Sequence, residues 1–142
     1  MRVLGITDGQ TSGAAVIEDG RILAAVNEER LTRIKLARGF PRAAIAEVMR
    51  ISGTRPADLD GVGVAQINSE LREEVTDWPG WFEARDDETD IHSMFFRAAS
   101  TFGSLAPTLP GLKKAYYAAR LPVYRYRRKR IKAILAEEFD IR

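Results

Sequence analysis

Two turn signals separate three short apolar runs at the start of the chain, and this arrangement constrains the fold most. Residues 2–7 (RVLGIT) have the apolar content of a buried strand and lead into a turn-rich stretch at 8–13. The next two apolar runs, AAVIED and RILAAVN, meet at Asp19-Gly20. An Asp-Gly pair between apolar runs is a strong hairpin signal because type I′ turns need positive φ. We therefore expect two or three antiparallel strands.

A helix and a further strand are expected next. Apolar residues at helical spacing predict an amphipathic helix over 41–52, with Pro41 in its first turn and Gly53 as its C-terminal stop. A polar link at 56–60 then leads to GVGVAQI (61–67), which reads as a buried strand. A strand reached through a helix favours a mixed or parallel sheet. The expected class is therefore α/β, in which N-terminal antiparallel strands join a mixed sheet with flanking helices.

Charge divides the second half of the chain. Nine acidic residues and two arginines lie between Glu70 and Asp90, whereas nine basic residues and no acidic one lie between Lys113 and Lys132. Such segregation gives each region its own electrostatic field.

Two further helices are expected, over 91–102 and 123–139, with a linker at 107–111. We divide the chain into 1–69, a strand-turn-strand and helix core, and 70–142, an acidic loop and helical region of the same incomplete domain.

Composition excludes several classes of protein. The chain has 142 residues, 45% of them hydrophobic, which is typical of one globular domain rather than a disordered segment. It has no cysteine, so disulfides and thiolate metal sites are excluded. No apolar run reaches the roughly 18 residues that a membrane span needs, and the N-terminus lacks the apolar core of a signal peptide. A cytoplasmic protein without a membrane span is expected.

A longer pattern runs through the first 45 residues. Its positions are Gly5, Ala14, Ala15, Asp19, Gly20, Ala24, Ala25, Glu28, Glu29, Arg30, Thr32, Arg33, Lys35, Phe40, Pro41, Ala44 and Ile45. In one unbroken register, these residues resemble the opening of the O-carbamoyltransferases that modify nodulation factors and antibiotics. The resemblance implies a partial actin-like (ribonuclease H-like) domain, similar to the domains of tRNA threonylcarbamoyl-adenosine synthases.

The resemblance also implies a reaction. The family transfers a carbamoyl group from carbamoyl phosphate to a hydroxyl-bearing acceptor through an ATP-derived carbamoyl-adenylate. ATP and a divalent metal are expected for the complete family enzyme, but this chain alone supports neither. The family's metal ligands include paired histidines, whereas this chain has one histidine, His92, which we interpret as a helix-start or surface residue. We therefore expect an incomplete N-terminal part, which either joins a missing C-terminal portion or associates with itself.

The first turn is the expected phosphate site. Thr7, Gly9, Thr11 and Ser12 combine small residues, which let backbone N–H groups approach an anion, with hydroxyl donors. Gln10 occupies the catalytic position where the family usually has a histidine. Glutamine can hydrogen-bond a phosphate or acyl oxygen, but it cannot carry a proton at neutral pH.

Charged residues after the hairpin give two equally weighted interpretations. Glu29, Arg33 and Lys35 are the residues we select as substrate-binding, because guanidinium and ammonium groups offset phosphate charge. The alternative is a solvated turn whose acids and bases pair locally.

Other functions remain open on the sequence. Gln10 and the absent histidines favour a non-catalytic remnant or partner-binding module. The basic run at 125–130 could bind nucleic acid or an anionic membrane surface. A solvated helix face, or one covered by the acidic segment, is the commoner arrangement, so a nucleic-acid partner is not expected. Trp78, Trp81 and Phe82 could line an acceptor pocket, although an anchoring contact is the commoner role.

Overall fold

A computed structural model describes most of the chain. The chain forms two compact units. The described residues are 1–9, 11–65, 71–76 and 110–141. One unit comprises Met1–Trp78 with Arg127–Arg142, and the other comprises Pro79–Tyr126. The predicted helix at 91–102, Trp78, Trp81, Phe82, His92 and Gln10 lie outside the described residues. The division of the chain at residue 69 stays a prediction.

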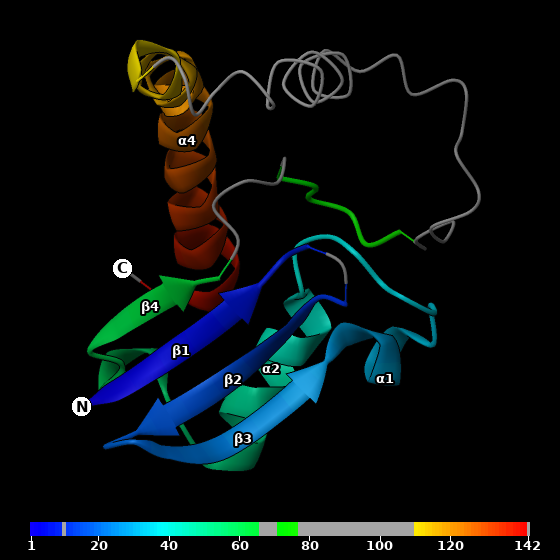
Figure 1. Cartoon of the computed structure of the whole chain (residues 1–142). Coiled ribbons are helices and arrows are strands. Elements are labelled where there is room, and N and C mark those ends of the chain that lie inside the picture. Colours follow the sequence, from blue (N-terminus) through cyan, green and yellow to red (C-terminus); the bar gives the residue numbers. More distant parts are fainter. Residues whose placement is uncertain (10, 66–70, 77–109, 142) are drawn as a thin grey trace. The chain divides into compact units, whose positions relative to one another are not determined.

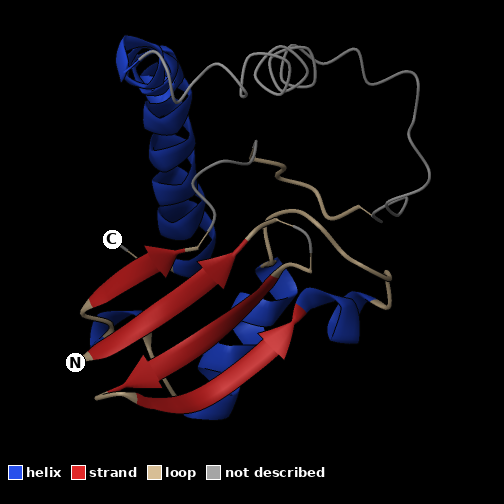
Figure 2. Ribbon diagram, viewed as in Figure 1, coloured by secondary structure: helices blue, strands red, loops and turns tan. Residues whose placement is uncertain are grey.

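A four-stranded mixed sheet is the centre of the first unit (Figures 1 and 2). Its strands are β1 (Arg2–Thr7), β2 (Gly13–Glu18), β3 (Arg21–Asn27) and β4 (Gly61–Val64). The spatial order is β3-β2-β1-β4. Strand β2 is antiparallel to both β1 and β3, and β4 is parallel to β1. The expected meander and the mixed sheet are both confirmed.

The turn between β2 and β3 has the predicted conformation. Asp19 has φ 47° and Gly20 has φ 80°, so both central residues are left-handed. Positive φ at both positions is the requirement of a type I′ turn, whose twist matches that of the flanking strands.

Helices follow the strands largely as expected. They are α1 (Glu28–Thr32), α2 (Arg42–Ser52) and α4 (Pro110–Phe139), with a short 3₁₀ turn at Pro56–Asp58. Gly53 ends α2 at φ 62°, as predicted. The prediction for the last helix is wrong at its start, because α4 includes Pro110 and Gly111, which we assigned to a linker. Proline needs no N–H partner in a first turn, so it can begin a helix as readily as interrupt one.

One face of the sheet carries the core of this unit. The helices α2 and the end of α4 both lie behind the sheet in Figure 1. Buried side chains join the strands to these helices: Leu4, Ile6 and Val16 from the sheet, Phe40, Ile45 and Val48 from α2 and the residues before it, and Ile131, Ile134 and Leu135 from α4. This is the mixed sheet with flanking helices that the sequence predicts, and it is consistent with a partial actin-like domain.

The opposite face of the sheet has small side chains. Gly63, Gly5, Ala15 and Ala25 pair in one row across the four strands. Further along this face, Ile17 is 37% exposed and Ile22 is 68% exposed. In the described ranges, no helix has the length and apolar content to cross a membrane.

Candidate functional site

The turn between β1 and β2 is held by the segment at 37–39. The backbone N–H of Ser12 donates to the carbonyl of Ala37 at 2.8 Å, and its Oγ donates to the same carbonyl at 3.1 Å. The N–H of Gly39 donates to the carbonyl of Asp8 at 3.2 Å. These contacts fix both ends of the turn, so its conformation depends on residues that follow it by 25 positions or more.

The predicted phosphate-binding residues occupy different environments in this turn. Thr7 is half-buried at the end of β1, and Gly9 is buried. Thr11 is exposed and left-handed, with φ 53°. Ser12 is fully buried, and its hydroxyl already donates to Ala37. Among the residues that carry a hydroxyl, Ser12 therefore supports the turn, whereas Thr7 and Thr11 have the exposure that a hydroxyl needs to contact a ligand.

Asp8 is a buried charge that sequence reasoning missed. Its side chain is 0% exposed and pairs with Arg127, which is 7% exposed. Side chains alternate along a strand, so position 8 follows Leu4 and Ile6 onto the core side. An acid in that register requires a partner, because an unpaired buried charge is very costly. That register was the available signal, but the partner lies 119 positions away and no local pattern indicates it.

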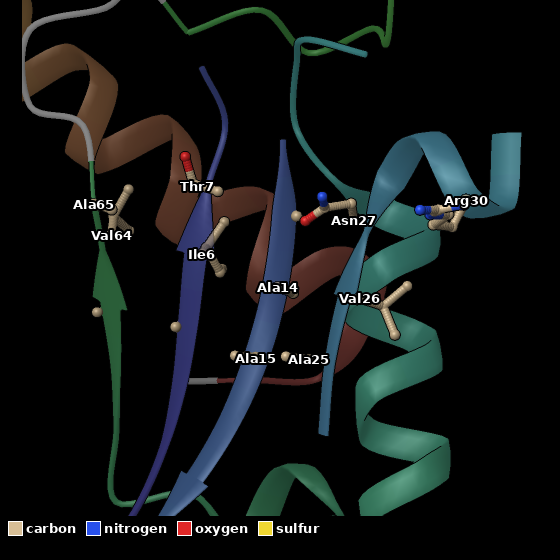
Figure 3. Close-up of a pocket in the computed structure, with 13 residues that line it drawn as sticks. Ile6, Thr7, Ala14, Ala15, Ala25, Val26, Asn27, Arg30, Val64 and Ala65 are labelled. Carbon is tan, nitrogen blue, oxygen red and sulfur yellow. The ribbon is translucent and has the colours of Figure 1, made fainter. Parts of the chain in front are cut away.

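A pocket of about 890 Å³ lies over the small-residue face of the sheet. Thr7, Gly13, Asn27 and Arg30 line it, together with the row of glycines and alanines and the residues beside them. Figure 3 shows Thr7, Asn27 and Ala65 at the same end of the strands, with Arg30 on α1 beyond Asn27. The pocket thus combines an apolar floor with a hydroxyl, an amide and a guanidinium at one end.

Some of the charged residues after β3 contact their own segment of the chain, and one lines the pocket. Glu29 Oε2 accepts a hydrogen bond from the Leu36 N–H at 3.0 Å. Arg33 has φ 61° at the end of α1, and its N–H donates to the Glu29 carbonyl at 2.9 Å. Arg30 lines the pocket, whereas Arg33 and Lys35 are exposed and are not among its lining residues. A role for Glu29, Arg33 and Lys35 in binding substrate stays a prediction.

Glu28 is a second buried acid, and its role is structural. Its two carboxylate oxygens accept hydrogen bonds from the backbone N–H groups of Ala43, at 3.2 Å, and Ala44, at 2.7 Å. Those N–H groups belong to the first turn of α2, which has no side-chain cap of its own. Glu28 therefore connects the end of β3 to the start of α2.

Comparison with known proteins identifies the family. Residues 2–129 match the family described as Carbamoyltransferase N-terminus. The chain belongs to this carbamoyltransferase N-terminal family. The resemblance of its first 45 residues is thereby confirmed.

Two relatives are similar to parts of this carbamoyltransferase N-terminal chain. The nodulation protein NolNO of Sinorhizobium fredii is 45% identical over 49 residues, which are 34% of this chain and 7% of that protein. The uncharacterized protein MJ1051 of Methanocaldococcus jannaschii is 34% identical over 65 residues, which are 46% of this chain and 12% of that protein. The chain thus matches only a small share of the length of each relative.

The described part of the carbamoyltransferase N-terminal chain does not fit a metal ion. Within it, no three His, Cys, Asp or Glu side chains come together in a way that could hold one. The two buried carboxylates near the turn already have partners, Asp8 with Arg127 and Glu28 with α2.

Acidic residues cover part of the basic helix. Arg130 forms two hydrogen bonds to the Glu73 carboxylate, at 2.6 and 2.8 Å. This interaction with Arg130 lowers the pKa of Glu73. Arg130 and Arg127 therefore both pair with acids of the same unit. The pair of Arg130 with Glu73 favours a helix face partly covered by the acidic segment, and the pair of Arg127 with Asp8 attaches the same helix to the first turn.

Proposed function

We propose that the chain is the N-terminal part of a carbamoyltransferase that moves a carbamoyl group from carbamoyl phosphate to the hydroxyl of an acceptor. The observation that carries the proposal is the family match over residues 2–129. In the transfer step, the acceptor hydroxyl oxygen bonds to the carbamoyl carbon and gives up its proton to a base or to water. The bond from that carbon to the leaving phosphate oxygen breaks, and that oxygen keeps the electron pair. The family's route through a carbamoyl-adenylate, its ATP, its divalent metal and a cytoplasmic location belong to the same proposal.

The first turn and the pocket end beside it would face the phosphate. Gly9 and Thr11 would provide backbone and hydroxyl donors from the turn, and Thr7 would provide a hydroxyl from the end of β1. Arg30 would supply a guanidinium, whose fork of N–H donors matches phosphate oxygens. Asn27 would present an amide at the same end. We therefore assign Arg30 to the phosphate in addition to Arg33 and Lys35, which do not line the pocket.

Calorimetric titration tests the proposal. Carbamoyl phosphate and ATP are titrated into the chain alone, and into the chain mixed with the downstream portion of a family carbamoyltransferase. We expect carbamoyl phosphate to bind, and Arg30→Gln to weaken binding roughly tenfold because a charge-assisted hydrogen bond is lost. Arg21→Gln is the matched control, since Arg21 is an exposed cation at the opposite end of β3. If neither ligand binds in either mixture, the proposal is wrong.

A non-catalytic partner-binding module is the second candidate. The exposed apolar side chains on the sheet face, such as Ile22 at 68% exposure, favour it. This alternative predicts that the chain binds the downstream portion while neither protein, alone or combined, binds carbamoyl phosphate.

A further inference from the structure

The ion pair between Asp8 and Arg127 lies directly beneath the candidate phosphate turn. Asp8 follows Thr7, which lines the pocket, but its carboxylate lies on the core side, where it is 0% exposed. Both carboxylate oxygens accept hydrogen bonds from Nη2 of Arg127. Arg127 is one helical turn before Ile131, which is also buried in the core. The pair therefore ties the turn to the face of α4 that packs on the sheet.

The negative charge of Asp8 would repel any anion that binds the turn. Its carboxylate is one residue from the hydroxyl of Thr7, and water does not reach it to screen its charge. Like charges repel more strongly where water is excluded than in bulk solvent. An uncompensated Asp8 would therefore oppose a phosphate at the place where Thr7, Gly9 and Thr11 offer donors.

We propose that Arg127 is a positioning residue for the phosphate-facing turn: it holds the turn through Asp8 and cancels the carboxylate charge that would repel the anion. The inference rests on the proposed function, because it assumes that the turn faces a phosphate. Ser12 and Gly39 also hold the turn, but through neutral hydrogen bonds that leave the charge of Asp8 unchanged.

Opposite effects of the two single substitutions follow from this role. Arg127→Gln leaves the Asp8 carboxylate uncompensated, so phosphate should bind more weakly. Asp8→Asn removes the negative charge of the carboxylate beneath the turn, so phosphate should bind more tightly. A pair that only held the turn in shape would weaken binding in both variants.

The experiment measures binding of inorganic phosphate and of carbamoyl phosphate to the full chain by calorimetry at low salt. From the strength of charge interactions away from water, we expect roughly tenfold weaker binding in Arg127→Gln and roughly threefold tighter binding in Asp8→Asn. The double variant Asp8→Asn/Arg127→Gln should return to within about threefold of the unmodified chain, because its neutral pair restores the balance of charge. Arg130→Gln, which breaks a neighbouring ion pair of α4, should leave the affinity within about twofold of that of the unmodified chain.

A ligand-free measurement separates this inference from the proposed function. Amide hydrogen exchange of Gly9 and Ser12 should be at least about tenfold faster in Arg127→Gln and nearly unchanged in Arg130→Gln. If neither anion binds to the unmodified chain, alone or mixed with the downstream portion of a family carbamoyltransferase, the proposed function is wrong, and exchange alone decides whether Arg127 holds the turn. If the turn amides exchange equally in both variants, the inference is overturned.

Folding of the variants is checked by thermal unfolding. If Arg127→Gln does not fold, Asp8→Asn and the double variant still decide the question. Weaker anion binding in Asp8→Asn would contradict the role of charge cancellation. So would a double variant whose affinity does not return from that of Arg127→Gln or Asp8→Asn toward that of the unmodified chain.

Discussion

Two glycines near the turn lie where neighbouring backbone atoms leave no room for a Cβ. A Cβ at Gly13 would lie 2.7 Å from the Val26 carbonyl oxygen and 3.0 Å from Asn27 Oδ1. Gly39 has φ 128°, and a Cβ there would lie 2.3 Å from the Glu74 carbonyl oxygen. Backbone atoms cannot yield as a flexible side chain can, so these positions require glycine. The close approach of β2 to β3 at the pocket depends on Gly13.

Gly13→Ala should therefore lower the free energy of unfolding by about 1–3 kcal/mol, the usual cost of forcing an extra methyl group into a packed site. Urea denaturation measures the change. Gly61→Ala is the matched control, since it also lies in a strand but a Cβ there would meet nothing within 4 Å. Equal losses in the two variants would show that strand propensity, rather than the contact with Val26, sets the cost.

The start of α2 shows how one element completes another. Pro41 precedes the helix and offers no side-chain cap, and the first turn contains no acidic residue. The first N–H groups of a helix need acceptors, and a negative charge is favourable beside them. Glu28 meets both needs from the beginning of α1. The junction between the β-meander and α2 is therefore specified by a side chain outside the helix that it caps.

Glu28→Ala should cost about 1–3 kcal/mol of stability, because it leaves two buried or half-buried N–H groups without their acceptor. Glu28→Gln should cost less, since its amide oxygen can still accept one hydrogen bond. Chemical denaturation of both variants tests this order. Glu137→Ala, on the exposed side of α4, serves as the control and should change stability by less than about 0.5 kcal/mol. If Glu28→Ala is as mild as the control, the cap does not contribute.

At the scale of the whole molecule, ion pairs connect segments that are far apart in sequence. Arg42 on α2 forms hydrogen bonds of 2.6 and 2.8 Å to Glu138 at the end of α4. Arg42 also donates to the carbonyl of Glu73, whose side chain binds Arg130. Together with the buried Ile134, these contacts attach the last turns of α4 to the sheet unit.

These pairs predict a dependence of stability on pH. Hydrogen bonding to Arg42 lowers the pKa of Glu138, and hydrogen bonding to Arg130 lowers the pKa of Glu73, both from an ordinary value of 4.5. A carboxyl whose pKa is lower in the folded state adds stability that is present above about pH 4.5 and is lost as the pH falls through the lower value. Acid should therefore weaken the attachment of α4.

Replacing both carboxyls tests this dependence. The variant Glu73→Gln/Glu138→Gln should be less stable than the unmodified chain at neutral pH and should lose less stability on acidification, so that the two curves converge as the pH falls through the lowered pKa values of the two carboxyls. Urea midpoints across a pH series measure this, with Glu137→Gln as the control. Parallel curves at every pH would contradict the prediction.

Much of the meander and part of the site could be predicted from the sequence. Asp19-Gly20 specifies its turn through backbone sterics, and the helix at Arg42–Ser52 follows from periodicity within a few residues. The motif of the first 45 residues identified the family, which the match over 2–129 confirms. The same motif did not distinguish Arg30 from Arg33, because which cation reaches the pocket depends on where α1 ends.

The amino-acid sequence by itself determined the strands, their hairpin, the amphipathic helix and the family, because each depends on residues close together along the chain. Only the tertiary structure decided that Asp8 pairs with Arg127, that Glu28 caps α2 and that the pocket lies over the small-residue face of the sheet. Those contacts join residues up to 119 positions apart. A local pattern can indicate that a buried charge needs a partner, but only the path of the folded chain brings that partner into contact.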